Sequence, residues 1–205
     1  MSRPDPKGCY AVVLAAGAAR RFNGAKLLAP VRGRPLVQWP TAAALASGVE
    51  SVTVVLGARA QEVEEALRPL AGARLSVVTC ENWQNGLSAS LQCGVSTLPP
   101  DARAVLVFLG DMPSLDAGLA DRVLHEVLRG APAAFPVVDD KPGHPVALSR
   151  ALFPDIARLR GDQGARKLLE KLDGVVRIPT DDEGCLLDID TAEDLAHMVP
   201  PPETF

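Results

Sequence analysis

The 205-residue sequence is poor in aromatic residues, and positive charge is not in excess. Only 4% of the residues are aromatic, so valine, leucine and alanine must build the core, and the 47% hydrophobic fraction allows a sizeable one. The net charge of -4 argues against non-specific nucleic-acid binding, because such binding needs a basic face. No apolar run approaches the ~20 residues of a membrane-spanning helix. We therefore expect neither a nucleic-acid nor a membrane partner.

Cysteine is scarce and is not arranged in a recognisable motif. Cys9, Cys80, Cys93 and Cys185 include no CxxC pair, and no histidine lies at zinc-type spacing from them. Reduced, structural cysteines are therefore expected. Residues 1–7 are polar and contain proline where a signal peptide would have an apolar core, which predicts a cytoplasmic location.

Apolar runs alternate with amphipathic segments along most of the chain, which is typical of an α/β protein. The apolar runs are continuous, so they predict a three-layer fold with a mainly parallel, Rossmann-like sheet covered on both faces. The looser pattern after Asp139 predicts a small C-terminal lobe within a single domain. Strands are expected at 10–15, 52–56, 75–78, 105–109, 133–138, 175–178 and 186–189, a short extended piece at 27–31, and helices at 42–47, 61–70, 89–98, 119–128, 150–159, 165–172 and 191–198.

A loop of small residues and cations follows the first predicted strand. Glycine permits backbone conformations that other residues resist, and short side chains leave room for a nucleotide. Backbone N–H groups and cations of such a loop can surround a phosphate chain, although a surface loop with solvated cations explains this stretch equally well. The loop is neither a Walker loop nor GxGxxG. Its nucleotide-binding candidates are Leu14, Ala15, Ala16, Gly17, Arg21 and Lys26.

Asp111 lies just beyond the predicted strand at 105–109, and the carboxyl ends of parallel strands meet at one edge of a sheet. Magnesium is commonly held by one or two protein carboxylates together with phosphate oxygens and water. Asp111 is therefore a candidate ligand, with Asp190 as the second and Asp188 as a neighbouring alternative. Each carboxylate has a structural interpretation as a helix or turn cap, and spacing alone favours the cap for Asp190.

A cationic loop beside a metal site indicates phosphoryl or nucleotidyl transfer. An acceptor phosphate would attack the α-phosphorus in line and pyrophosphate would leave, which requires positioning and electrostatics but no covalent nucleophile. The candidate catalytic residues are therefore Arg21, Lys26 and Asp111.

Seven separate segments resemble motifs of the molybdenum cofactor nucleotidyltransferases, in the same order along the chain. Two positions depart from the family pattern: Ala19 stands where a serine is usual, and Phe22-Asn23 replaces Met-Gly. The matching segments are Leu14–Gly17 continued through Arg21 and Lys26, Gly33–Leu36, Asn82–Leu91, Gly110–Pro113, Gly143–Val146, Gly161–Arg166 and Asp188–Asp194.

The resemblance implies a fold of the nucleotide-diphospho-sugar transferase type and a magnesium-dependent transfer of CMP from CTP to molybdopterin, with a molybdoenzyme as a client. Members with an Ala-Ala-Gly strand end, as at Ala15–Gly17, tend to use CTP and those with LAGG tend to use GTP. It also implies a nucleotide-binding part at about 8–138 and an acceptor-binding part at about 139–199. The residues that it adds are Gly86 and Ser90 for the nucleotide, and Ser88, His144, Gln163 and Arg166 for the acceptor.

Other functions remain open at this point. A nucleotidyltransferase of the same fold can use GTP or act on a sugar or alcohol phosphate, and a non-catalytic carrier would bind the molybdenum cofactor without turnover. An oxidoreductase on a Rossmann-like fold is a further alternative, although the sequence lacks GxGxxG. His144 has an equally good structural interpretation as a loop histidine bonded to a backbone carbonyl.

Overall fold

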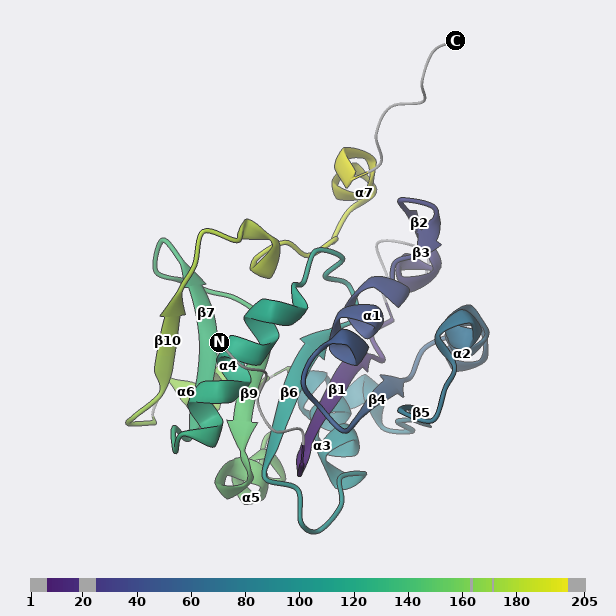
Figure 1. Cartoon of the computed structure of the whole chain (residues 1–205). Coiled ribbons are helices and arrows are strands. Elements are labelled where there is room, and N and C mark those ends of the chain that lie inside the picture. Colours follow the sequence, from purple (N-terminus) through teal and green to yellow (C-terminus); the bar gives the residue numbers. More distant parts are fainter. Residues whose placement is uncertain (1–6, 19–24, 163, 171, 199–205) are drawn as a thin grey trace.

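An eight-stranded sheet forms the middle layer of the computed structural model, which describes residues 7–18, 25–162, 164–170 and 172–198 (Figure 1). Along the sheet the order is β10-β7-β9-β6-β1-β4-β5, and β8 pairs with β7. The strands are β1 (Cys9–Ala15), β4 (Ser51–Leu56), β5 (Leu75–Thr79), β6 (Ala104–Leu109), β7 (Ala133–Val138), β8 (Lys141–Pro142), β9 (Val146–Ser149) and β10 (Val176–Pro179).

β1 lies between β4 and β6 and is parallel to both. The chain adds β4 and β5 on one side of β1 and then returns to add β6 on the other side, so the strand order reverses next to β1. Ligands of open α/β sheets bind at such a reversal, beyond the carboxyl ends of the strands. The end of β1 and the end of β6 are therefore the expected place for a site.

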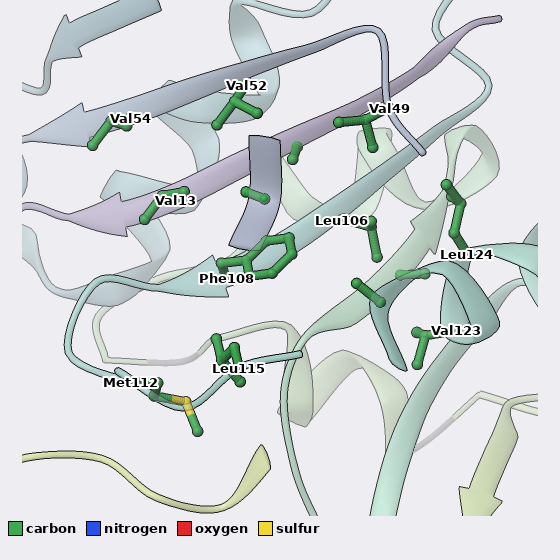
Figure 2. Close-up of a cluster of buried hydrophobic side chains, with 14 of the residues drawn as sticks. Val13, Val49, Val52, Val54, Leu106, Phe108, Met112, Leu115, Val123 and Leu124 are labelled. Carbon is green, nitrogen blue, oxygen red and sulfur yellow. The ribbon is translucent and has the colours of Figure 1, made fainter. Parts of the chain in front are cut away.

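Alternate residues of β1 serve two different cores. Val13 packs in one buried cluster with Val54 and Phe108 of the neighbouring strands and Val123 of helix α4 (Ala117–Leu128), as Figure 2 shows in part. Val12 belongs to the cluster on the opposite face. All seven residues of β1 are buried, which explains why the apolar run is continuous where a half-exposed strand would alternate.

Helices cover both faces of the sheet. α1, α2 and α4 contribute to the cluster that contains Val13, whereas α3, α5 and α6 contribute to the one that contains Val12. α7 and the β2–β3 hairpin lie beyond the edge at which the parallel strands end (Figure 1). The bounds are α1 (Gln38–Ala46), α2 (Ala60–Leu67), α3 (Leu87–Ser96), α4 (Ala117–Leu128), α5 (Phe153–Ile156), α6 (Ala165–Leu169), α7 (Ala192–Met198), β2 (Pro30–Val31) and β3 (Arg34–Pro35).

The three-layer α/β fold with a mainly parallel sheet is confirmed, but two local predictions were wrong and a third was right only in part. Residues 186–189 form no strand: Ile189 is buried against Val31 and Leu36, so its apolar side chain serves packing outside the sheet. The helix expected at 150–159 is a 3₁₀ turn followed by the short α5. The extended piece expected at 27–31 is extended at β2, Pro30–Val31, but begins within a 3₁₀ helix, Lys26–Leu28.

β9 is an antiparallel strand that the sequence analysis did not predict. Val146 at its start pairs with Val107 near the end of β6, so the start of β9 lies at the edge where the parallel strands end. The Gly143–Val146 motif therefore reaches that edge from the opposite chain direction. Among the described helices, none is long and apolar enough to cross a membrane.

Tyr10, the chain's single tyrosine, gives a first testable prediction. Its hydroxyl donates to Glu50 Oε2 at 2.9 Å, and burial, that hydrogen bond and the charge of Glu50 raise the pKa of Tyr10 to about 12. The near-ultraviolet absorbance of the phenolate should therefore appear only near pH 12 in the folded protein and near pH ~10 in denaturant. Because the folded-state pKa is the higher one, this contribution to stability is present below pH ~10 and is lost as the pH rises to about 12.

Glu50→Gln is the matched variant, because it removes the charge and leaves an amide of the same shape. It should lower the pKa of Tyr10 in the folded protein. A phenolate that forms at its ordinary pH in the folded wild type would contradict the assignment.

Candidate active site

Lys26 joins two carboxylates from distant parts of the chain. Its Nζ donates to Asp111 Oδ2 and to Asp190 Oδ1, each at 2.8 Å. Asp111 follows β6, and Asp190 precedes α7. Burial by itself lowers the pKa of Lys26. The negative charges of Asp111 and Asp190 and their hydrogen bonds to the ammonium outweigh burial, so the pKa of Lys26 lies above its usual value. The lysine is therefore a charged ammonium held between two carboxylates.

Asp188 adds a third carboxylate to this cluster. Partial desolvation raises its pKa, and the negative charges of Asp190 and Asp111 raise it further, while Lys26 acts in the opposite direction. Three carboxylates and one ammonium leave an excess of negative charge at the edge of the sheet. That excess is the electrostatic condition for binding a divalent cation.

The donor set fits magnesium with incomplete protein ligation. Asp111 and Asp190 together supply the one or two carboxylates that magnesium commonly takes from a protein, with phosphate oxygens and water completing its shell. Across the described ranges, no group of three or more His, Cys, Asp or Glu is arranged to hold a metal ion by itself. A metal here would thus depend on its nucleotide for further ligands.

The segment that carries Asp190 is fixed independently of Lys26. Ile189 N donates to the backbone oxygen of Asp111 at 3.1 Å. Asp194 Oδ2 accepts from the backbone N–H groups of Asp190 and Thr191 at 2.9 and 2.7 Å, and Asp194 N donates to Thr191 Oγ1 at 3.2 Å. The side chains of Thr191 and Asp194 therefore cap α7, so the capping role that spacing favoured for Asp190 was wrong. Its carboxylate points instead to Lys26.

The start of the glycine loop is tied to its neighbours through the backbone. Leu14 O accepts from Gly110 N at 2.9 Å, and Ala16 O accepts from Ala58 N at 3.1 Å. Ala15 and Ala16 are buried, whereas Gly17 is exposed, and a Cβ on Gly17 would meet nothing within 4 Å. Arg21, and with it Ala19 and Phe22-Asn23, lies outside the described residues.

Gly86 is needed for a close approach at the start of α3. Its φ is +96°, and an added Cβ would lie 2.5 Å from Asp162 Oδ1. Ser88 N donates to Gly161 O at 3.1 Å, which holds the same two segments together. Ser88 lines a cavity of about 550 Å³ with Asn82 and Asn85, and Ser90 is buried. Gly86 thus has a packing role that its motif alone did not reveal.

His144 and Arg166 line a larger cavity of about 680 Å³, which also reaches the side chain of Leu14. The backbone N of His144 donates to Cys185 O at 2.8 Å, while its buried Nδ1 has no hydrogen-bond partner. Burial lowers the pKa of His144, so the ring is neutral near pH 7. An orphaned polar atom beside a cavity is a candidate contact for a ligand or water. Gln163 lies outside the described residues.

Several residues of this cavity escaped the sequence analysis. Phe135 and Arg177 lie in predicted strands, and Leu87 and Leu169 lie in or beside predicted helices. The sequence shows that Phe135, Leu87 and Leu169 are apolar, but it does not show that they share a cavity. The pairing of β10 with β7 places Arg177 beside Phe135, and the pairing of β7 with β9 brings Phe135 to the same cavity as His144. Nothing in the local sequence signals that placement.

The model of the MobA-like NTP transferase domain matches residues 11–175. The chain belongs to this family. It is a nucleotidyltransferase enzyme, as the motifs predicted.

Three similar proteins differ in how much of each chain the similarity covers. Nicotine blue oxidoreductase of Paenarthrobacter nicotinovorans is 34% identical, covering 92% of this chain and 95% of that protein. The bifunctional protein GlmU of Trichlorobacter lovleyi is 31% identical over 73% of this chain, which spans only 32% of GlmU. The crystal structure of Rv0371c of Mycobacterium tuberculosis is 29% identical with a TM-score of 0.82, and the match covers 97% of this chain and 99% of Rv0371c. A second structure of Rv0371c is a complex with manganese; it is 27% identical with a TM-score of 0.77, and the match covers 93% of this chain and 97% of that one.

Gly57 offers a test of how tightly the glycine loop is packed. A Cβ at this position would lie 2.6 Å from both Ala16 O and Trp83 Cγ. We expect Gly57→Ala to displace one of them, to lower the free energy of unfolding by ~1–3 kcal/mol and to weaken nucleotide binding. Chemical denaturation and calorimetric nucleotide titration measure the two effects.

Gly72→Ala is the matched control, since an added Cβ there meets nothing within 4 Å. It should leave both quantities close to those of the wild type. Equal effects of the two substitutions would show that the contacts of Gly57 do not matter.

Proposed function

We propose that this MobA-like nucleotidyltransferase joins CMP from CTP to the terminal phosphate of molybdopterin, with release of pyrophosphate and a requirement for magnesium. The observation that carries the proposal is the Lys26 ammonium between Asp111 and Asp190, at the end of the glycine loop. The larger cavity is lined by Leu14 and by Leu109, two residues before Asp111. The manganese complex of Rv0371c supports a divalent cation in the family.

Each group in the cluster has a distinct task in this reaction. Asp111 and Asp190 would hold magnesium, which supplies charge neutralisation at the phosphate oxygens when bound. Lys26 and Arg21 bind the triphosphate and stabilise the negative charge that develops on the departing pyrophosphate. The backbone around Leu14–Gly17 positions the nucleotide, with Gly86 and Ser90 on the neighbouring segment.

The acceptor is assigned to the larger cavity, where His144 and Arg166 lie. Its volume of about 680 Å³ falls in the range of small-molecule sites. Val107 and Phe135 supply an apolar wall suited to a flat ring system, and the Arg166 guanidinium suits a phosphate. Ser88 and Gln163 complete the proposed acceptor set. We thus assign the nucleotide to residues of about 8–138 and most of the acceptor set to about 139–199, with Val107 and Phe135 of the larger cavity and Ser88 of the smaller one contributed from the first part.

One observation favours a second candidate function. Nicotine blue oxidoreductase shares 34% of its aligned residues with this chain over nearly the full length of both. A redox activity with a nicotinamide cofactor is therefore the alternative, although the sequence lacks GxGxxG. Absorbance of the reduced cofactor, followed beside pyrophosphate release on the same sample, separates the two activities.

Ala16 provides a test of base preference. Its methyl group lies buried at the start of the glycine loop, where we propose that it crowds a purine and leaves room for a pyrimidine. Calorimetric titration with magnesium should show tighter binding of CTP than of GTP, and Ala16→Gly should reduce that preference by about tenfold. Ala71→Gly, at the exposed residue after the 3₁₀ helix Arg68–Leu70, is the control and should keep the wild-type ratio. Tighter GTP binding by the wild type would overturn the assignment.

Asp111 tests the proposed reaction itself. Pyrophosphate release is measured with each nucleoside triphosphate, with and without molybdopterin, and should require CTP and molybdopterin together. Asp111→Asn removes a charge that holds the metal and should slow release about a hundredfold or more, with folding retained in a thermal melt. Asp181→Asn, an exposed carboxylate outside the cluster, should turn over like the wild type. Full activity of Asp111→Asn would rule out this mechanism.

A further inference from the structure

The position of Lys26 conflicts with the arrangement needed during turnover. Its ammonium contacts Asp111 and Asp190 at 2.8 Å each, and its side chain is only 9% exposed. One oxygen of each carboxylate, Asp111 Oδ2 and Asp190 Oδ1, is therefore bonded to a cation of the protein itself. A metal ion placed between the two carboxylates would compete with this ammonium for their negative charge.

Lys26 is also the described cation nearest in sequence to the glycine loop, where a triphosphate would lie. Two cations repel each other, so an ammonium and a divalent ion do not share one pair of carboxylates without cost. A triphosphate, in contrast, offers oxygens to both cations. The ammonium has a favourable alternative partner only when the nucleotide is present.

We propose that Lys26 is an exchangeable counter-ion that blocks the metal carboxylates against a free divalent cation and transfers to the triphosphate when metal and nucleotide bind together. This inference rests on the proposed function, because it assigns the metal to Asp111 and Asp190. It adds an order to the site: free metal binds poorly, and the metal–nucleotide complex is the form that the site accepts.

The surrounding structure allows this exchange without rebuilding the site. Ile189 N remains bonded to Asp111 O, and Asp194 remains bonded to the backbone at Asp190, whichever cation the carboxylates hold. The lysine side chain has a flexible four-carbon stem, so its ammonium can move while the backbone of its 3₁₀ helix stays in place. The carboxylates are thus fixed and the ammonium is the mobile partner.

Charge counting gives the expected effect on metal affinity. With Lys26 in place, Asp111, Asp188 and Asp190 retain two uncompensated negative charges, and without it they retain three. Neutralising Lys26 should therefore strengthen the binding of a free divalent cation. After allowance for solvent screening at the half-exposed Asp190, we expect a gain of about tenfold in the affinity for Mn²⁺.

The experiment measures Mn²⁺ binding to nucleotide-free protein from the electron paramagnetic resonance signal of the free ion. Lys26→Met should bind Mn²⁺ about tenfold more tightly than the wild type. Lys26→Arg keeps the charge and should bind like the wild type. Lys141→Met removes an exposed lysine outside the carboxylate cluster and should also bind like the wild type. Unchanged or weaker binding by Lys26→Met, or equal tightening by either control, overturns the proposal.

A thermal melt shows whether each variant folds. If Lys26→Met does not fold, Lys26→Gln takes its place, because it removes the charge and its amide still donates to a carboxylate. Pyrophosphate release by the wild type separates the two proposals. Wild-type turnover without tighter Mn²⁺ binding by the variant refutes the exchange alone. Absence of CTP-dependent turnover refutes the proposed function.

Discussion

The ion pairs of Lys26 are the interaction on which the rest of the site depends. An ammonium that is nearly excluded from water is strongly unfavourable unless it is paired, and here two carboxylates pair it. These partners lie 85 and 164 residues further along the chain. Lys26 therefore requires that the end of the glycine loop, the end of β6 and the approach to α7 lie together. Loss of Lys26 would deprive both carboxylates of this cation, whereas loss of either carboxylate would leave the ammonium with one partner.

The sheet makes that meeting possible. β6 is parallel to β1, and the bond from Gly110 N to Leu14 O continues their pairing just past β6. Asp111 is thus delivered to the same edge as the glycine loop by strand register alone. β9 runs in the opposite direction, so His144 reaches this edge from the start of a strand. The carboxyl ends of β1 and β6 and the amino end of β9 therefore lie at the same edge of the sheet.

This difference decides what the sequence could predict. Parallel, fully buried strands leave long apolar runs, so the placement of Lys26 and Asp111 at one edge followed from the pattern. β9 is only four residues long and leaves no such run, and the apolar residues at 186–189 look like a strand although Ile189 packs in a loop. Spacing favoured a cap at Asp190 as well as at Thr191, and the contacts of the structure assign the cap to Thr191 and Asp194 and leave the Asp190 carboxylate to Lys26.

An acidic protein must still attract a triphosphate, and the charges of the site show how it does so. Lys26 is already neutralised by Asp111 and Asp190, and Asp188 adds a further negative charge. Because these charges sum to a negative value, the carboxylate cluster without a metal ion repels the negatively charged triphosphate. In the proposed exchange, a divalent cation cancels the two excess negative charges and frees the ammonium for the phosphates, so the net repulsion of the nucleotide is removed in one binding event. The proposed exchange thus gives the metal an electrostatic role at this edge, independently of any chemistry that it performs on the reacting phosphate.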